Sequence, residues 1–517
     1  MAIVQASSSM STMISLPFSS SLLIPSLLFF LVLIFWKRSW KARGSILKLP
    51  PPGPRKLPFI GNLHQLIGSG SLPHHSLRNL AKKYGPVFHV QMGELSTVII
   101  SSPKAAREVL MTHDLSFAQW PTTFLAADIF PNARSGLFSY PFNDYYKQIR
   151  KICTQELLSA QRFHAFWSVR DEEISNLIES ISSSQGLPFN LSKGLLSLAN
   201  NTISRTSFGE KSKSQNEFIQ LVKEMTTLSQ GFNVPDLFPS VKFLSFFTGM
   251  TRALERLFRQ IDKILQDMID DHKKEMMRND YPHKEDLIHA FLKLQKSSEM
   301  QMDITTTQIK AVSLDLYIGA GESTAITLEW AISELLKHPR VMEKAQAEVR
   351  QALRGKGKLE ETDIQKLDYV KSVIKETLRL HPPVPLLITE CRERCKVGEY
   401  DIPVKMKAIV NAWAIGRDPE YWINADNFQP ERFLGSSNID FKGTDFEYIP
   451  FGAGRRICSG LQFGAATLEI ALTQLLYNFD WELPNGMKPE ELDMTEADGA
   501  TSRRKNDLYV IATRRTT

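Results

Sequence analysis

The residue with the clearest chemical potential is Cys458, which lies in the segment PFGAGRRICSG at Pro450–Gly460. Three glycines permit a turn that holds backbone close to a ligand, and the stretch LQFGAATLEIALTQLL behind it predicts a helix whose first amides point toward the sulfur. Arg455 and Arg456 stand just before the cysteine. These features favour a thiolate over a thiol, and a thiolate can act as a nucleophile or as a metal ligand.

Several kinds of cysteine chemistry remain open. A cysteine is most often a small buried hydrophobe, and a zinc site would need neighbouring cysteines or histidines that this segment lacks. Cys391 and Cys395 could form half of a metal site, but no third cysteine follows nearby to complete an iron–sulfur pattern. A papain-like nucleophile would need a positioned histidine, which sequence alone does not exclude. The arginines favour anionic groups, such as carboxylates, beside the metal or ligand.

A long helix is predicted at Thr305–Lys337, with a capping box at its start (TTTQ) and a stop at the His-Pro pair that follows. Its middle reads IGAGESTAIT, and Gly319 and Gly321 each cost about 1 kcal/mol relative to alanine in a helix. The glycines indicate either a close helix crossing or a tight passage against a flat ligand. In the second case, Glu322 and Ser323 would line a polar pocket.

Two further motifs contain charged residues that can pair. KETLRLHPP places Glu376 and Arg379 three residues apart, on one face of a helix. FQPERF adds Arg432 as a candidate third member. Taken alone, each is an ordinary solvated ion pair, which is the commoner case.

The fold class predicted for this chain is mostly α with small β-sheets. Strand patterns are few and occur at Val87–Ile100, Tyr400–Trp413 and Asp507–Thr513. The hydrophilic run at Asp271–Asp286 predicts an exposed loop between two helices.

Composition is that of a globular protein of 517 residues, with 43% hydrophobic and 23% charged side chains. The net charge of +6 gives no dense basic patch, so we expect no nucleic-acid partner. Four scattered cysteines are too few for a disulfide framework, which favours a reducing compartment for the folded part.

A membrane anchor is predicted at residues 1–36, which carry no charged side chain. Leu16–Trp36 would span about 31 Å as a helix, enough to cross a bilayer, and the basic flank KRSWKAR keeps the bulk of the chain cytosolic. The N-terminus lacks the basic start of a cleaved secretory signal and the arginines of an organelle transit peptide, so both are less favoured than an anchor. Residues 37–60 read as a basic flank and proline-rich hinge, and 61–517 as one catalytic domain.

Together these motifs resemble the cytochrome P450 haem-thiolate enzymes. The signature F-x-x-G-x-R-x-C-x-G is present, as are the E-x-x-R motif and the arginine of P-E-R-F. The resemblance spans practically the whole chain, and PPPGP, KYGPV, IKETLRLHPP and PERF are most similar to the plant microsomal A-type branch. It implies the cytochrome P450 fold behind the single transmembrane helix.

The resemblance implies haem b as the cofactor, with Cys458 as axial thiolate to the iron. Arg456 would pair with a haem propionate, and Arg150 with Tyr146 would contact the propionates where similar proteins carry W-x-x-x-R. Glu376, Arg379 and Arg432 would form a buried structural network. The signature residues that complete the haem-binding turn are Phe451, Gly454 and Gly460.

Glu322 and Ser323 are implied as the acid–alcohol pair that delivers protons during oxygen activation. Ser323 stands where threonine is usual and lacks the methyl group that fixes a threonine rotamer, so we expect competent but leakier oxygen activation. The alternative is that Ser323 merely bonds back to a helix carbonyl.

A largely hydrophobic substrate pocket with a few hydroxyl groups is implied, and it suits a rigid apolar metabolite. We expect hydroxylation of a plant specialised metabolite with terpenoids favoured, and alkaloids or phenolics as the alternative. Desaturation, ring coupling or rearrangement would be a second outcome, and a haem protein without turnover a third. The implied pocket residues are Trp120, Phe124, Phe138, Ile318, Gly319, Ala320, Val384, Leu387, Ile388, Ala500 and Thr501.

The chain contains no G-x-G-x-x-G dinucleotide fingerprint and has no length left for a flavin domain. Electrons would therefore come from a separate NADPH-cytochrome P450 reductase, so that NADPH serves only indirectly. Lys147 and Lys151 are candidate contacts for its acidic face, or else part of a solvated helix surface. The resemblance places the protein in the endoplasmic reticulum membrane.

Overall fold

The computed structural model describes residues 50–515, apart from 68–70, 122–134, 139, 157–164, 185, 210–213, 230–232, 242–244, 246–247, 279–285, 297–303, 357–358 and 436–438. The chain divides into two compact units, Met1–Leu49 and Pro50–Thr517, and the described residues belong to the second. The predicted membrane anchor and its basic flank therefore lie outside the described residues. Among the residues that are described, no helix combines the length and the hydropathy needed to cross a membrane.

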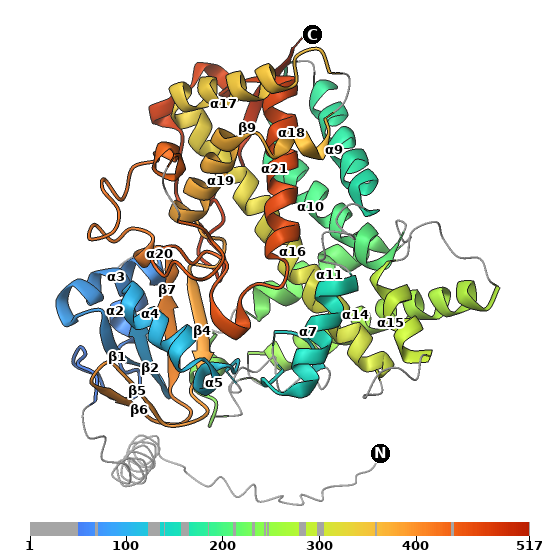
Figure 1. The fold of residues 1–517 in the computed structure, drawn as a ribbon. Coiled ribbons are helices and arrows are strands. Elements are labelled where there is room, and N and C mark those ends of the chain that lie inside the picture. Colours follow the sequence, from blue (N-terminus) through green and yellow to red (C-terminus); the bar gives the residue numbers. More distant parts are fainter. Residues whose placement is uncertain are drawn as a thin grey trace, which may run out of the picture. The chain divides into compact units, whose positions relative to one another are not determined.

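The described unit is mainly helical with short strands, as the sequence predicts (Figure 1). Its strands are β1 (Val87–Met92), β2 (Leu95–Ile100), β3 (Phe189–Asn190), β4 (Leu386–Glu390), β5 (Cys395–Val397), β6 (Tyr400–Ile402), β7 (Lys407–Asn411), β8 (Phe479–Glu482) and β9 (Tyr509–Arg514). Its α-helices are α2 (Leu63–Ile67), α3 (Pro73–Tyr84), α4 (Pro103–Arg107), α5 (Asp114–Phe117), α7 (Asp144–Glu156), α9 (Trp167–Ser182), α10 (Leu191–Phe208), α11 (Gln215–Leu228), α12 (Val234–Leu237), α14 (Met250–Arg278), α15 (Leu287–Lys296), α16 (Thr306–Lys337), α17 (Pro339–Ala352), α18 (Glu361–Ile364), α19 (Asp368–Leu380), α20 (Ala412–Ile415) and α21 (Leu461–Asn478).

The largest sheet has the strand order β1-β2-β7-β4. β1 and β2 form an antiparallel hairpin, β2 runs parallel to β7, and β7 pairs antiparallel with β4. Residues far apart in the sequence thereby become neighbours, since Ile99 of β2 pairs with Ile409 of β7, which pairs with Ile388 of β4. β4 is the strand that brings predicted pocket residues to the sheet.

The predicted long helix is confirmed as α16. The Thr305 hydroxyl accepts from the backbone N–H of Gln308, while the Gln308 side chain accepts from the backbone N–H of Thr305. This is the capping box that the sequence predicts. The helix ends at Lys337 because His338 precedes Pro339, which disfavours the helical conformation at the residue before it.

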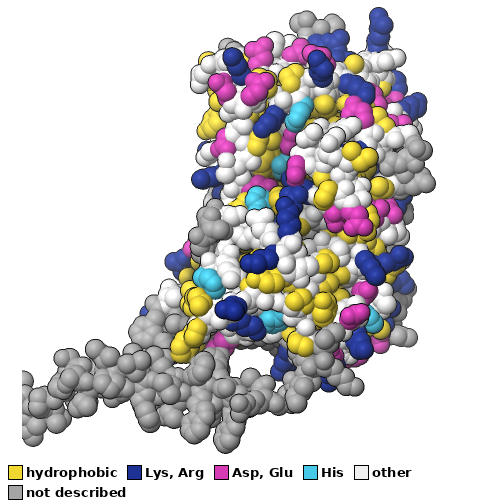
Figure 2. Space-filling view, turned by 90° about the vertical axis from the view of Figure 1, so that its left-hand side faces the viewer, with side chains coloured by type: hydrophobic (Ala, Val, Ile, Leu, Met, Phe, Trp, Pro, Cys, Tyr) yellow, Lys and Arg dark blue, Asp and Glu magenta, His cyan; other side chains and the backbone are white. Residues whose placement is uncertain are grey.

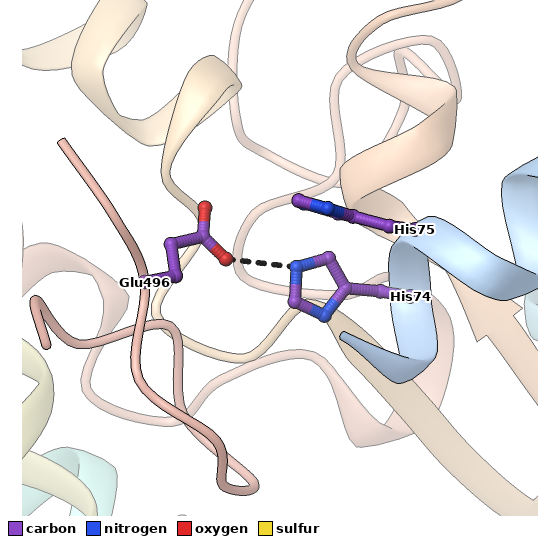
Figure 3. A group of neighbouring side chains, drawn as sticks. All are labelled: His74, His75 and Glu496. Carbon is purple, nitrogen blue, oxygen red and sulfur yellow. Dashed lines mark hydrogen bonds and ion pairs between the residues drawn. The ribbon is translucent and has the colours of Figure 1, made fainter. Parts of the chain in front are cut away.

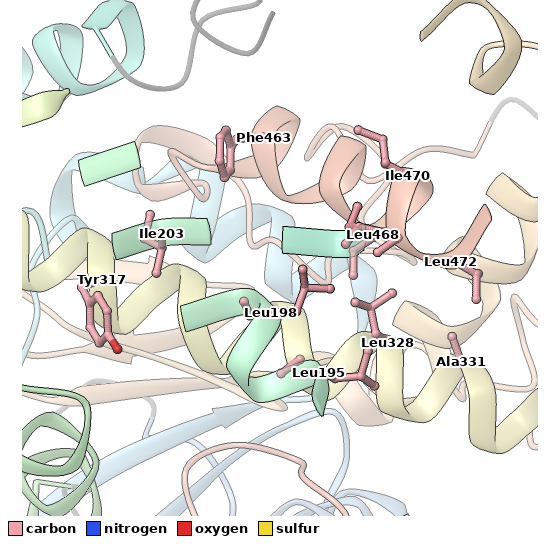
Figure 4. Close-up of a cluster of buried hydrophobic side chains, with 14 of the residues drawn as sticks. Leu195, Leu198, Ile203, Tyr317, Leu328, Ala331, Phe463, Leu468, Ile470 and Leu472 are labelled. Carbon is pink, nitrogen blue, oxygen red and sulfur yellow. The ribbon is translucent and has the colours of Figure 1, made fainter. Parts of the chain in front are cut away.

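α16 packs against α10 and α21 around the main hydrophobic core (Figure 4). A fully buried leucine contributes about 1.5–3 kcal/mol to folding, so these contacts fix the three helices firmly against one another. The cysteine turn comes directly before α21 and Glu322 lies in α16, so this packing sets the separation of the two. The buried side chains at the contact include Leu195 and Leu198 of α10, Leu328 and Ala331 of α16, and Leu468 and Leu472 of α21.

The prediction of an exposed loop at Asp271–Asp286 is wrong at both ends. α14 continues to Arg278, and His272 and Asp286 are both buried. The Nε2 atom of His272 lies 2.8 Å from Oδ2 of Asp286, whose other oxygen accepts from the backbone N–H of His289. The first part of the hydrophilic run, up to Arg278, belongs to an amphipathic helix whose apolar face packs on the core, so its polarity reflects only the side that faces solvent.

The end of the predicted hinge, residues 50–60, is not helical, as its prolines predict. It lies against β1, where the backbone N–H of His89 donates to Pro52 O at 2.6 Å. A Cβ on Gly53 would lie 2.1 Å from His89 O, so only glycine permits this approach.

The face shown in Figure 2 carries mixed charge. Lysine and arginine side chains lie between aspartates and glutamates, with hydrophobic side chains among them. A face of this kind gives little of the continuous positive potential that binds a phosphate backbone.

His74 of α3 bonds to Glu496 near the C-terminus, with His75 beside it (Figure 3). Nε2 of His74 lies 2.8 Å from Oε2 of Glu496, and Nδ1 of His381 lies 3.8 Å from the other oxygen. Burial alone would raise the pKa of Glu496, but the hydrogen bond with His74 and the nearby His381 outweigh it and hold the pKa well below its usual range. Burial, followed by the charges of His74 and Arg417, lowers the pKa of His75 to about 4.

We predict that the free energy of unfolding decreases as the pH falls from about 6.5 to about 4. Burial, then the charge of Lys56, lowers the pKa of His89 to about 4 from an ordinary value of 6.5. A histidine with a lowered pKa is neutral in the fold, so its contribution is complete above pH 6.5 and is lost as the pH falls through 4. For His89 the loss in the free energy of unfolding is about 3 kcal/mol. His75 is partly solvated and acts in the same direction with a smaller contribution.

Urea unfolding at several pH values between neutral and about pH 4.5 measures this effect. His89→Gln should flatten the dependence, because the variant has no group at this position to protonate. His64→Gln changes an exposed histidine and should keep the wild-type dependence. Equal curves for His89→Gln and the wild type would contradict the prediction.

Candidate functional site

The turn around Cys458 has the conformation that its glycines predict. Gly452 and Gly454 have φ values of +73° and +66°, which L side chains rarely adopt. The backbone N–H of Cys458 donates to Phe451 O at 2.9 Å and closes the turn. A Cβ on Gly454 would lie 1.8 Å from Leu110 O, so only glycine fits there. α21 begins at Leu461, just behind the cysteine.

The Cys458 side chain is exposed and makes no disulfide. Even so, burial among the surrounding protein atoms raises its pKa, against a hydrogen bond from the Gly460 backbone and the charge of Arg150. The expectation that the neighbouring arginines favour a thiolate is therefore not met by the protein groups alone. Arg455 turns away to Asp114, with Nε 2.8 Å from Oδ2. The cationic charge of a bound metal would stabilise the anionic sulfur instead.

Arg456 and Arg150 converge beside the cysteine turn with Tyr146. Arg150 donates to the Tyr146 hydroxyl at 3.2 Å and to Ile457 O at 2.6 Å. The guanidinium carbon of Arg456 lies 4.4 Å from the centre of the Tyr146 ring, and burial lowers its pKa. Its N–H groups donate to the carbonyl oxygens of Leu137, Phe138, Ala118 and Tyr140.

This set of donors fits a haem. In the described part of the chain neither Arg150 nor Arg456 has a carboxylate partner, and Nε of Arg456 is buried without a hydrogen-bond partner. Two cations beside an accessible sulfur suit a metal-containing cofactor that carries carboxylates at its edge. The Tyr146 oxygen accepts from Arg150, so its own hydrogen remains available for donation.

The two glycines of α16 have different roles. A Cβ on Gly321 would lie 2.5 Å from Oδ1 of Asn200, so this glycine permits the close crossing with α10. Gly319 is exposed, and a Cβ there would lie 3.1 Å from the Phe138 ring. The interpretation of a close helix crossing is therefore confirmed for Gly321, while a passage of Gly319 against a flat ligand stays a prediction.

Glu322 and Ser323 of α16 do not bond to each other. The Ser323 hydroxyl donates to Gly319 O at 2.7 Å, which is the backbone arrangement considered as the alternative role of this serine. Oε1 of Glu322 accepts from the Thr501 hydroxyl at 3.2 Å. The hydroxyl next to the acid thus comes from the C-terminal segment.

Asp315 is a site residue that the motifs do not point out. Its Oδ2 accepts from the backbone N–H of Phe138 at 2.9 Å. Burial raises the pKa of Asp315 to about 7, although hydrogen bonds from Phe138 and Leu137 act against this. Arg456 holds the carbonyls of the same two residues, so the segment is fixed between α16 and the cysteine turn. The sequence offered one signal for this site residue, since Asp315 is a carboxylate one helical turn before Gly319.

The structure brings part of the predicted pocket together. The Phe138 ring lies against Gly319, with the half-buried Ile318 and Ala320 on either side of that glycine. Thr501 reaches Glu322, while its neighbour Ala500 is exposed. Trp120 is partly exposed, and Phe124 lies outside the described residues.

β4 separates two of the predicted pocket residues. A Cβ on Gly452 would lie 3.9 Å from Cδ1 of Leu387, so Leu387 faces the cysteine turn. Successive residues of a strand point to opposite faces, and Ile388 packs against the other hydrophobic cluster, with Ile99 and Ile409. Ile388 therefore does not share a wall with Leu387. Val384, just before the strand, is exposed.

Glu376 and Arg379 form a fully buried pair. Arg379 donates to both carboxylate oxygens, from Nε at 2.7 Å and Nη2 at 2.8 Å, and Arg432 reaches Glu376 at 3.0 Å. The remaining Arg379 donors bind backbone carbonyls of Gly416, Ala425 and Asn427. The three residues predicted to form a network are therefore in contact, and their other hydrogen bonds go to backbone carbonyls.

Comparisons with known proteins agree with this geometry. A family model described as Cytochrome P450 matches residues 51–510. Desmethyl-deoxy-podophyllotoxin synthase of Sinopodophyllum hexandrum is 52% identical over 97% of both chains. Melianol synthase CYP71BQ17 of Ailanthus altissima is 49% identical over 96% of this chain and 95% of that protein. Premnaspirodiene oxygenase of Hyoscyamus muticus is 47% identical over 94% of this chain and 97% of that protein.

A solved structure of a zebra fish cytochrome P450 with progesterone has the same fold. Its TM-score is 0.73 at 24% identity, and the match covers 85% of this chain and 99% of that one. The long family match and the extensive identity to the plant proteins go further than fold. The chain therefore belongs to the cytochrome P450 family, whose members are monooxygenases that use haem b.

Proposed function

We propose that this protein inserts one atom of O₂ into a hydrophobic plant specialised metabolite, with terpenoids favoured over alkaloids and phenolics. The other oxygen atom leaves as water, with two electrons from NADPH delivered by a reductase and two protons. The observation that carries the proposal is the accessible Cys458 sulfur beside two arginines that have no carboxylate partner among the described residues. That arrangement supports haem binding.

The residues of this chain have distinct roles in the proposal. When bound, the haem supplies the iron chemistry that activates dioxygen. Cys458 ligates the iron, while Arg150, Arg456 and Tyr146 hold the propionates. Phe451, Gly454 and Gly460 shape the turn. Glu322 holds a proton for delivery to the reacting oxygen. The Ser323 hydroxyl would join this delivery only by leaving Gly319 O.

The substrate class rests on the side chains near the haem-binding turn. Phe138 lies against Gly319, and Leu387 faces the cysteine turn. We propose that they line one apolar pocket, which Ile318, Ala320, Val384 and Ala500 extend. Such a lining suits a rigid apolar scaffold. The similar plant proteins are named for desmethyl-deoxy-podophyllotoxin, melianol and premnaspirodiene, and we propose a substrate of comparable origin.

We propose that residues 1–36 anchor the protein in the endoplasmic reticulum membrane, with residues 61–517 as the cytosolic catalytic domain. The uncharged N-terminus and its basic flank support this placement. Lys147 and Lys151 are exposed on α7 and are proposed contacts for the acidic face of the reductase. Arg150 lies between them in the sequence and points inward to Ile457 O.

Product analysis with ¹⁸O₂ tests the proposal. Microsomes containing the full chain, reductase and NADPH should convert candidate terpenoid and alkaloid scaffolds to products that carry one ¹⁸O atom. An altered product without label would instead support desaturation, coupling or rearrangement. Absence of turnover across the scaffolds, in a protein with intact haem ligation, would contradict the proposed substrate class.

A further inference from the structure

The contact between Thr501 and Glu322 joins two segments that the sequence keeps 179 residues apart. The Thr501 hydroxyl donates to Oε1 of Glu322 at 3.2 Å, while the adjacent Ser323 hydroxyl is bonded to a carbonyl of its own helix. The neighbouring hydroxyl that orients the acid is therefore Thr501. The other oxygen of Glu322 has no hydrogen-bond partner within the described residues.

Thr501 is held in place by the residue that follows it. Ser502 is buried, and its carbonyl accepts from Trp330 Nε1 at 2.6 Å, two turns along α16 from Glu322. Its backbone N–H donates to Pro383 O at 3.1 Å, and its hydroxyl donates to Pro382 O. Trp330 is itself fully buried and stacks on His381, with ring centroids 3.9 Å apart. Backbone attached at these points gives the neighbouring Thr501 hydroxyl little freedom.

We propose that Thr501 is a positioning residue that fixes the Glu322 carboxylate for proton delivery during oxygen activation. This inference rests on the proposed role of Glu322. A glutamate on a helix has several rotatable bonds, and a hydrogen bond to one oxygen removes much of that freedom while leaving the other oxygen available to hold or pass a proton. Without the Thr501 hydroxyl, the carboxylate would leave its productive position. Oxygen would then be released more often as hydrogen peroxide, with both electrons consumed and no atom transferred to substrate.

The test compares Thr501→Val, which keeps the shape but loses the hydroxyl, with Thr501→Ser, which keeps the hydroxyl. In the full chain with reductase, Thr501→Val should release about fivefold more peroxide per NADPH than the wild type. Thr501→Ser should stay near the wild type. Glu322→Gln should be at least as uncoupled, and Thr501→Val should add nothing in the Glu322→Gln background, because the two residues act as one unit.

Two measurements besides turnover separate this role from substrate binding. Double-mutant cycles on the thermal unfolding midpoint should show coupling between Thr501→Val and Glu322→Leu, because each substitution removes one partner of the hydrogen bond. Substrate titrations by the haem spectral shift should give similar affinities for Thr501→Val and Thr501→Ser.

The outcomes identify which statement fails. If Glu322→Gln uncouples the enzyme while Thr501→Val does not, this inference is overturned and the role of Glu322 stands. If Glu322→Gln leaves coupling unchanged, the proposed role of Glu322 fails, and this inference with it. If Thr501→Val uncouples equally in both backgrounds, Thr501 acts on the substrate and the inference is overturned.

Discussion

Replacement of Cys458 with serine is expected to reduce monooxygenase turnover by at least about a thousandfold, which corresponds to about 4 kcal/mol of lost barrier reduction. Serine is nearly the same size, and the backbone bond from residue 458 to Phe451 O does not depend on the side chain. The turn should therefore persist while the ligand changes. A neutral hydroxyl cannot supply the electron donation of a thiolate. Turnover and the spectrum of the reduced, carbon monoxide-bound protein measure the effect.

Cys395→Ser is the matched control for this prediction. Cys395 is a free, half-buried cysteine in β5, so the same substitution there should leave the thiolate-type Soret band in place. A Cys458→Ser protein that retains this band would show that another residue ligates the iron. The haem assignment to this turn would then fail.

Replacement of Arg379 with leucine is expected to prevent accumulation of folded protein. Arg379 directs its donors to Glu376 and to three backbone carbonyls, and both side chains of the pair are fully buried. Removing one partner leaves a buried charge without compensation, which costs about 3–5 kcal/mol. A cost of this size is a large part of the stability of a typical domain. Soluble yield and haem incorporation measure the loss.

Arg256→Leu provides a control with the same substitution on the surface. Arg256 pairs with Glu224 at 2.9 Å, but both side chains are well exposed, so its removal should cost less than about 1 kcal/mol. The double variant Glu376→Leu/Arg379→Leu should not restore folding. The carbonyls of Gly416 and Ala425 would stay buried without donors. Normal yield of Arg379→Leu would contradict the structural role of the pair.

Much of the architecture around the site follows from short-range patterns in the chain. The capping box at Thr305 and the His-Pro stop define α16 within one residue at its start, because both signals act inside a single helical turn. Glu376 and Arg379 are three apart on α19, which places them on one face before any tertiary contact forms. The glycines before Cys458 likewise specify a turn through their own backbone freedom.

Several site features could not be obtained that way. The alternation of β4 assigns Leu387 and Ile388 to opposite faces, but only the pairing with β7 decides which face meets the cysteine turn. The hydrophilic run after Asp271 resembles a loop because polarity alone does not reveal that His272 and Asp286 meet inside the fold.

The sequence by itself determined the glycine turn before Cys458, the two ends of the long helix and the pairing of Glu376 with Arg379, because each depends on residues within about one turn of one another. Only the tertiary structure decided that Asp315 holds Phe138 and that Thr501, rather than Ser323, bonds to Glu322. These contacts join distant segments whose approach is fixed by the packing of α16 with α10 and α21 and by the attachment of Ser502 to Trp330. Helix packing depends on the whole core, and no local pattern of residues encodes it.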